Sequence, residues 1–185
     1  PAPAPPAVSA EGRGLVIQPS VDSQHFRPLE GAEQGERMRG PLRDLLPACE
    51  AEFHDSSSKS SGSPCVTIAL LGRLSREKSP GLFLQAAHHV LQKYAFARFA
   101  VIGAGLLLDA LRELAARLGI QDKVAFVGFV AYEELPAYLR DVDIVVNPSQ
   151  SETFCIANIE AMAMAIPLVT FAVGGKCAAL RRVSC

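Results

Sequence analysis

The sequence lacks an excess of either charge. Its 18 Lys and Arg residues nearly balance its 19 Asp and Glu residues, which gives a formal net charge of −1 at pH 7. Proteins that attract nucleic acids or anionic membranes over long range usually carry a marked positive charge. We therefore expect no nucleic-acid partner, and any phosphate-binding site must be built locally.

Long apolar runs are also missing. No stretch approaches the roughly 20 apolar residues that cross a bilayer as a helix, and the N-terminus lacks the basic and apolar regions of a secretory signal. No transmembrane segment is expected, and the predicted location is cytoplasmic, with the cytosolic face of a membrane as the other option. The chain begins with Pro1 rather than Met, so we interpret it as a fragment or a processed product.

The cysteines lack the spacing of a disulfide framework or a zinc site. They are odd in number, widely separated and without a CxxC pair, at Cys49, Cys65, Cys155, Cys177 and Cys185. This pattern is more typical of a reducing compartment. No oxygen-rich cluster indicates a metal either, so no metal cofactor is expected.

What the sequence does contain is enough apolar material for one core. Hydrophobic residues make up 49% of the 185 residues, which fits one soluble domain with an additional tail. Residues 1–14 form a Pro/Ala-rich tail that we expect to be extended or disordered. Residues 15–64 hold a short strand at 15–17 and a flexible Ser-rich insertion. The folded domain is expected at 65–185.

From residue 65 onward, strand and helix signals alternate. Unbroken β-branched apolar runs predict strands, and apolar stripes at helical spacing predict helices. The strands are expected at 66–72, 99–103, 123–128, 143–148 and 167–172, and the helices at 79–94, 106–119, 133–141 and about 154–165. Pro80 suits a helix start and Gly119 a helix end. This alternation predicts an α/β fold with a doubly wound, mostly parallel, Rossmann-like sheet.

In such a sheet, every loop that follows a strand lies at one edge. Doubly wound folds bind their ligands at that edge. The loops expected there carry glycines and charges, at Gly72, Arg73, Lys78, Gly103–Gly105, Gly128, Pro148–Glu152 and Gly174–Gly175. The functional site is therefore expected at this edge.

Two cations follow the first strand of this series. Arg73 and Lys78, in the segment GRLSREK, can neutralise a diphosphate, Arg through a bidentate fork and Lys as a point charge. The alternative is that they are ordinary solvated side chains, as we expect for Arg76 in the same loop. Their place at the ligand-binding edge favours a functional role.

Glu152 and Glu160 give the sharpest local signal, because they lie eight positions apart where a loop enters a helix. A helix N-terminus attracts phosphate, and carboxylates accept hydrogen bonds from hydroxyls. The alternative has Glu152 stabilising the helix dipole and Glu160 as a surface acid. Because Glu160 has apolar neighbours, its carboxylate needs a partner. The pattern favours a site for a phosphorylated polyol.

Two other motifs are weak. Gly103–Gly105 matches part of a dinucleotide fingerprint, but Leu108 stands where the third glycine belongs, which disfavours a nicotinamide-dependent oxidoreductase. Asp141 and Asp143 have the DxD spacing of metal-bound nucleotide-sugars in a different fold. They precede a strand, however, and should lie at the edge opposite the site, so we interpret them as structural.

Five ordered segments resemble a known family. They are GRLSREK, VIGAG, KVAFVGFV, DIVVNPSQSETFCIANIEAMAMAIPLV and AVGG. Together they resemble the C-terminal nucleotide-sugar-binding domain of retaining glycosyltransferases of group 1, related to sucrose-phosphate synthase and bacterial mannosyltransferases. The resemblance covers about residues 65–175 and implies one half of the two-domain architecture called GT-B.

The resemblance also implies roles for the site residues. Arg73, Lys78 and Glu152 would be the catalytic residues: the two cations hold the donor diphosphate and stabilise it as it leaves, and Glu152 lies near the transferred sugar. Glu160 would bind the ribose. No metal is implied, because catalysis would be electrostatic support of the leaving group. The further donor-binding positions implied are Gly103, Gly128, Ser149, Phe154, Cys155 and Ile156.

The chain departs from the family pattern in several places. Cys155 and Ala165 stand where glycine is usual, and the acid expected soon after Gly174–Gly175 is absent. The family's final strand and closing helices are missing, so the domain is expected to be truncated at its C-terminus. The N-terminal domain, which binds the acceptor and usually contributes a catalytic His, is missing as well.

Two hypotheses follow. In the first, the chain is the donor-binding half of a hexosyltransferase that uses a nucleoside-diphosphate sugar, retains the anomeric configuration and is inactive in isolation. In the second, it is a degenerate, non-catalytic nucleotide-binding or interaction module, as the departures at Cys155 and the C-terminus indicate.

Overall fold

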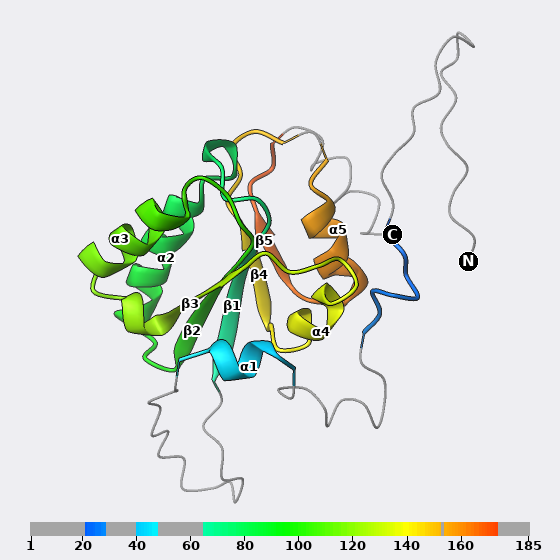
Figure 1. Ribbon diagram of the computed structural model, residues 1–185, viewed down its shortest axis with the longest axis horizontal. Coiled ribbons are helices and arrows are strands. Elements are labelled where there is room, and N and C mark those ends of the chain that lie inside the picture. Colours follow the sequence, from blue (N-terminus) through cyan, green and yellow to red (C-terminus); the bar gives the residue numbers. More distant parts are fainter. Residues whose placement is uncertain (1–20, 29–39, 48–64, 153, 174–185) are drawn as a thin grey trace, which may run out of the picture.

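The computed structural model describes residues 21–28, 40–47, 65–152 and 154–173 (Figure 1). Several expectations concern residues outside these ranges. They are the tail at 1–14, the strand at 15–17, the Ser-rich run at 56–64, the glycine pair at 174–175 and the truncated end.

A five-stranded, wholly parallel sheet forms the centre of the domain. Its strands, in the spatial order β3-β2-β1-β4-β5, are β1 (Val66–Leu71), β2 (Ala97–Ile102), β3 (Val124–Gly128), β4 (Ile144–Asn147) and β5 (Leu168–Thr170). The five expected strands and the doubly wound parallel sheet are confirmed.

Helices cover both faces of the sheet (Figure 1). The helices α2 (Pro80–Leu91) and α3 (Leu108–Arg117) pack on one face, and α4 (Leu135–Leu139) and α5 (Ile156–Ala163) on the other. All four were predicted, with longer bounds. Three short elements had no recognisable pattern in the sequence: α1 (Leu42–Leu45) and the 3-10 turns η2 (Arg76–Lys78) and η3 (Gln121–Lys123).

The central strand shows why two separate cores form. Successive strand residues point to opposite faces, so Ile68 and Leu70 enter the core under α2 and α3, whereas Ala69 and Leu71 enter the core under α4 and α5. Each fully buried aliphatic side chain contributes roughly 1.5–3 kcal/mol. An uninterrupted apolar run is therefore what a strand covered on both faces requires.

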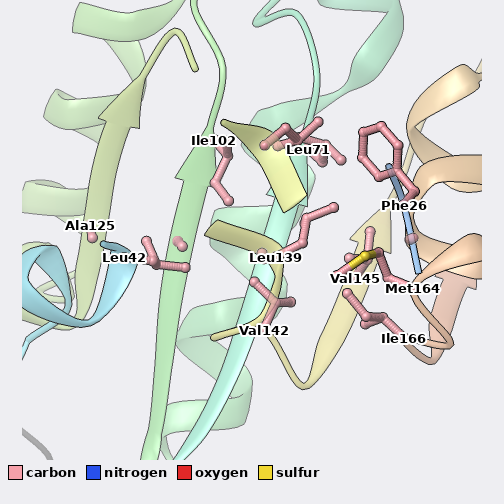
Figure 2. Packing of buried hydrophobic residues seen from close by; sticks show 14 of the residues in the cluster. Phe26, Leu42, Leu71, Ile102, Ala125, Leu139, Val142, Val145, Met164 and Ile166 are labelled. Atoms are coloured by element: carbon pink, nitrogen blue, oxygen red, sulfur yellow. The ribbon is translucent and has the colours of Figure 1, made fainter. Parts of the chain in front are cut away.

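The core under α4 and α5 also recruits residues from the N-terminal third of the chain. Phe26 and Leu42 are fully buried in it, as Figure 2 shows. The Phe26 ring lies 5.2 Å from that of Tyr132, whose carbonyl oxygen is 3.1 Å from Nε2 of His25. Residues 21–28 and 40–47 are therefore packed parts of the domain, a role that their sequence did not reveal.

Two helices end in the same hydrogen-bonded motif. In α3, the N–H groups of Gly119 and Ile120 donate to the carbonyls of Ala116 and Ala115, and Gly119 has φ of 68°. This is a Schellman motif, so the predicted helix end is confirmed. The end of α5 repeats both bonds, but Ala165 takes the left-handed position with φ of 54°.

Within the described ranges, the expectation of reduced thiols is wrong for Cys65. Cys65, which precedes β1, is disulfide-bonded, whereas Cys155 is a buried thiol that forms no disulfide. Across the described ranges, no helix combines the length and the apolar character needed to span a bilayer.

Candidate functional site

A pocket of about 650 Å³ lies at the carboxyl edge of the sheet, between the loops that follow β1, β2, β3 and β4. Its position fits the rule for doubly wound sheets, because the strand order reverses between β1 and β4. The pocket brings together eight of the ten residues predicted for the site, which are Arg73, Lys78, Gly103, Glu152, Phe154, Cys155, Ile156 and Glu160.

Gly128 and Ser149 do not line this pocket. The carbonyl of Gly128 accepts a hydrogen bond of 2.7 Å from the N–H of Gly103, which joins the ends of β3 and β2. Ser149 is fully buried and donates to Oδ1 of Asn147 at 2.5 Å. Both residues therefore make hydrogen bonds within the carboxyl edge of the sheet, outside the pocket lining.

Glycine is required where the β2 loop meets the β1 loop. A Cβ atom on Gly103 would lie 1.9 Å from the carbonyl oxygen of Gly72, and one on Gly105 would lie 2.4 Å from that of Leu74. No side chain can be accommodated at such distances. The partial dinucleotide fingerprint is thus explained by loop packing, which needs no nicotinamide cofactor.

The two cations of the β1 loop are in different states. Lys78 forms an ion pair with Glu152, and the two side chains are only 17% and 13% exposed. Arg73 is exposed at the pocket, and its side chain makes no hydrogen bond or ion pair with the residues that the structure describes. A hydrogen bond of 3.0 Å from the N–H of Gln150 to the carbonyl of Glu77 also joins the loops that hold the ion pair.

Glu160 is a buried acid that lines the pocket. Its residue is 7% exposed, and within the described ranges its side chain has no hydrogen-bond partner. Burial raises the pKa of this carboxyl above its ordinary value of 4.5, because desolvation penalises the charged form. The partner that the sequence requires for Glu160 is therefore not supplied by these residues, and a ligand hydroxyl can supply it.

The N-terminus of α5 opens into the same pocket. Its N-cap residue, Cys155, has φ of 56°, and no side chain among the described residues caps the helix. Ile156 and Ala157, which begin the first turn, both line the pocket. Uncapped N–H groups at a helix start attract an anion through their partial positive charge.

A buried polar network holds this helix start in place. Nδ2 of Asn147 donates to Sγ of Cys155 at 2.8 Å and to Oδ1 of Asn158 at 2.9 Å. Sequence reasoning missed both asparagines. A signal was available, because each asparagine stands in β4 or α5 at a position where the apolar pattern predicts burial. Buried side-chain amides must be hydrogen-bonded.

The opposite edge of the sheet holds the DxD motif. Asp141 is buried and accepts hydrogen bonds of 3.0 Å from the N–H groups of Gly40 and Arg43, and Asp143 accepts one of 2.9 Å from the N–H of Thr67. The structural interpretation of this motif is confirmed. Over the described part of the chain, no three His, Cys, Asp or Glu side chains gather as a metal site.

Comparison with known proteins places this geometry in context. Residues 52–182 match the family described as "Glycosyl transferases group 1". The D-inositol 3-phosphate glycosyltransferase of Streptomyces coelicolor is 33% identical over 176 residues, which cover 90% of this chain and 36% of that protein. The chain thus spans about a third of the length of the curated relatives that it matches.

Two solved structures share the fold. The C-terminal domain of LpcC, a glycosyl transferase group 1 family protein of Francisella tularensis, has a TM-score of 0.61 and 25% identity over 85% of this chain and 73% of its own. HepE of Anabaena, solved in complex with UDP-glucose, has a TM-score of 0.64 and 20% identity over 85% of this chain and 38% of its own. The chain accordingly has the Rossmann-like fold of one half of a GT-B protein.

Proposed function

Because the chain belongs to the glycosyl transferases group 1 family, we propose that its pocket binds a nucleoside-diphosphate sugar and supports transfer of the hexosyl group to an acceptor with retention of configuration. One observation carries this proposal: the pocket collects Arg73, Lys78, Glu152, Glu160 and the uncapped start of α5. HepE, which has the same fold, was solved with UDP-glucose, and this supports the donor class.

In this proposal, different residues of the pocket contact different parts of the donor. Arg73 and the first N–H groups of α5 hold the diphosphate, and Lys78 adds a second cation. As the bond between the sugar and the diphosphate breaks, the leaving oxygen gains negative charge, which these fixed positive groups stabilise. No metal takes part in this proposal, because the protein's own cations supply the compensating charge.

The two acids face the hydroxyl groups of the donor. Glu160 accepts hydrogen bonds from the ribose, which satisfies its buried carboxylate. Glu152 lies nearer the transferred sugar. Both assignments follow the family resemblance, and the unpartnered state of Glu160 among the described residues supports its part.

The acceptor belongs to a different part of the protein in this proposal. Since the chain spans about a third of its curated relatives, we propose that a second domain, absent from this sequence, binds the acceptor and that the chain alone transfers no sugar. We further propose a cytoplasmic location, where nucleotide-sugars would be available.

A second candidate function is a non-catalytic nucleotide-binding module. The observation in its favour is Cys155, which lines the pocket as the N-cap residue of α5, where the phosphate would approach and where the family pattern has glycine. Joining the chain to the N-terminal part of a group 1 relative distinguishes the two functions. Glycosylated product supports the transferase, and nucleotide binding without product supports the module.

Titration calorimetry with UDP-glucose, UDP and GDP on the full chain tests the donor site. We expect one of these ligands to bind, and the variant carrying Arg73→Ala and Lys78→Ala to bind it at least about a hundredfold more weakly, since each lost charged contact costs roughly 1.5–3 kcal/mol.

Arg76→Ala is the matched control, because Arg76 is exposed in the same loop and lies outside the pocket. Its affinity should stay within about twofold of the wild type, as expected for removal of a surface charge. A folded chain that binds none of the three nucleotides would overturn the proposed function.

A further inference from the structure

The ion pair between Lys78 and Glu152 places an acid directly beside a cation proposed to hold phosphate. Both side chains line the pocket, and neither is more than 17% exposed. A partly buried pair is screened by solvent and salt much less than a surface pair. The positive charge of Lys78 is therefore partly balanced by Glu152 before any ligand arrives, in contrast to that of Arg73.

The loops themselves keep the two groups together. The N–H of Gln150 donates to the carbonyl of Glu77, one residue before Lys78, so the loops after β4 and β1 are joined through their backbones as well as through the ion pair. A phosphate that binds Lys78 therefore meets the carboxylate of Glu152 close by. The carboxylate competes with the phosphate for the ammonium group and repels it.

Donor and product differ in how strongly they experience this repulsion. In an intact nucleotide-sugar, the terminal phosphate is esterified on both sides and carries about one negative charge. Once the bond to the sugar is broken, the terminal phosphate has a second ionisation near pH 6 and carries about −1.5 to −2 at pH 7. The additional charge appears at the end of the diphosphate where the sugar was attached.

We propose that Glu152 sets the preference of the pocket for an intact nucleotide-sugar over the nucleoside diphosphate released by transfer. This rests on the proposed function and adds to it a means of product release. While the sugar is attached, its hydroxyl groups hydrogen-bond to the carboxylate and offset the repulsion. After transfer these bonds are gone and the phosphate charge rises, so that the repulsion by Glu152 is no longer offset.

The test compares UDP-glucose and UDP by calorimetry on the full wild-type chain and on Glu152→Gln, which keeps the shape of the side chain and removes its charge. GDP-mannose and GDP replace them if the wild type prefers guanine nucleotides. We expect the variant to bind the diphosphate on the order of tenfold more tightly and to bind the nucleotide-sugar no better than the wild type. The ratio of the two dissociation constants therefore shifts by about tenfold or more.

Glu77→Gln is the matched control, because Glu77 is a neighbouring exposed acid outside the pocket. It removes one negative charge from the same loop, and the ratio should stay within about twofold of the wild type. Equal shifts in both variants would assign the effect to overall charge and overturn the proposal.

Labelling of Lys78 tests the ion pair without any nucleotide. An amine acylating reagent, followed by peptide mapping, should modify Lys78 severalfold faster in Glu152→Gln than in the wild type, with Lys93 as the internal reference. Equal rates would show that the pair is not held in solution, which contradicts the proposal. Tight nucleotide binding with an unchanged ratio in Glu152→Gln overturns this inference alone, whereas no binding by either protein overturns the proposed function with it.

Discussion

The two edges of the sheet differ in whether their buried charged groups have hydrogen-bond partners among the described residues. At the amino edge, Asp141 and Asp143 are fully engaged with backbone N–H groups, and Nε of the buried Arg98 donates to Oγ1 of Thr67. At the carboxyl edge, the described residues offer no partner to the carboxylate of Glu160. Figure 1 shows α1, which Asp141 holds, at the end of the sheet away from η2.

This difference separates structural charges from candidate ligand contacts. A buried charge that is satisfied within the protein stabilises one conformation, and removing it leaves other buried groups without partners. A buried charge left unsatisfied lowers stability and is retained where a ligand completes it. Variants at the two edges should therefore change stability in opposite directions.

The largest effect is expected for Asp141→Ala. This change removes the acceptor of two backbone hydrogen bonds. It also removes a negative charge near Arg98: burial lowers the pKa of Arg98, and Asp141 partly opposes that shift. We expect the free energy of unfolding in urea to fall by about 3 kcal/mol. Nucleotide affinity, measured below the unfolding transition, should be unchanged.

Asp109→Ala is the control for this prediction. The side chain of Asp109 is 92% exposed and, among the described residues, forms only a surface pair with Arg112. Its loss should change the free energy of unfolding by less than about 0.5 kcal/mol. Similar effects of the two substitutions would remove the distinction drawn for the amino edge.

An intermediate effect of opposite sign is expected for Glu160→Gln. The folded-state pKa of Glu160 lies above the ordinary value of 4.5. The wild type therefore loses stability as the pH rises from 4.5 through the raised pKa, and the amide does not. We expect the variant to be about 1.5 kcal/mol more stable at pH 8, with the gap closing towards pH 4.

Urea unfolding of both proteins across this pH range measures the effect. Glu113→Gln serves for comparison, because the side chain of Glu113 is 74% exposed, and its gap should stay within about 0.5 kcal/mol at every pH. In the same experiment series, Glu160→Gln should bind nucleotide more weakly. A gap that does not vary with pH would mean that the carboxylate is not buried without a partner.

The smallest effect is expected for Ala165→Gly, which concerns strain away from the pocket. Ala165 holds a left-handed conformation at the end of α5, whereas Gly119 fills the same place after α3. Relief of the strain, less the extra freedom of glycine in the unfolded chain, should raise the free energy of unfolding by about 0.5–1 kcal/mol. Nucleotide affinity should not change.

Gly119→Ala gives the reciprocal measurement in thermal or urea unfolding. It should cost a similar amount, because Gly119 has φ of 68° and a Cβ atom added there would meet open space, so only the backbone conformation matters. If both substitutions were neutral, the left-handed positions would carry no strain.

Much of the fold was readable because the signals were local and repeated. The apolar runs of β1 and β2 and the glycine after α3 each predict an element from a few neighbouring residues, and the order of the elements then determines the carboxyl edge. The burial of Phe26 and Leu42 was not readable, since their segments are held by residues about a hundred positions away: Phe26 packs against Tyr132, and the N–H groups on either side of Leu42 include that of Arg43, which donates to Asp141.

The candidate site was predicted as a set of residues and not as a set of interactions. Loop position brought Arg73, Lys78, Glu152 and Glu160 to one edge, but only the three-dimensional structure shows that two of them pair and that Glu160 stays without a partner among the described residues. Nor could spacing alone show that Ser149 turns inward to Asn147.

The place of β1 in the middle of the sheet has a consequence for the order in which the chain folds. β1 is the first strand of the sheet in the sequence, and its two neighbours arrive later, β2 first and β4 only after residue 143. Loop closure over such a distance carries an entropy cost that only later contacts repay. Glu152 follows Lys78 by 74 positions, so during synthesis on the ribosome the ion pair can form only after these residues have been added. We therefore expect the pocket to be among the last features of the domain to form.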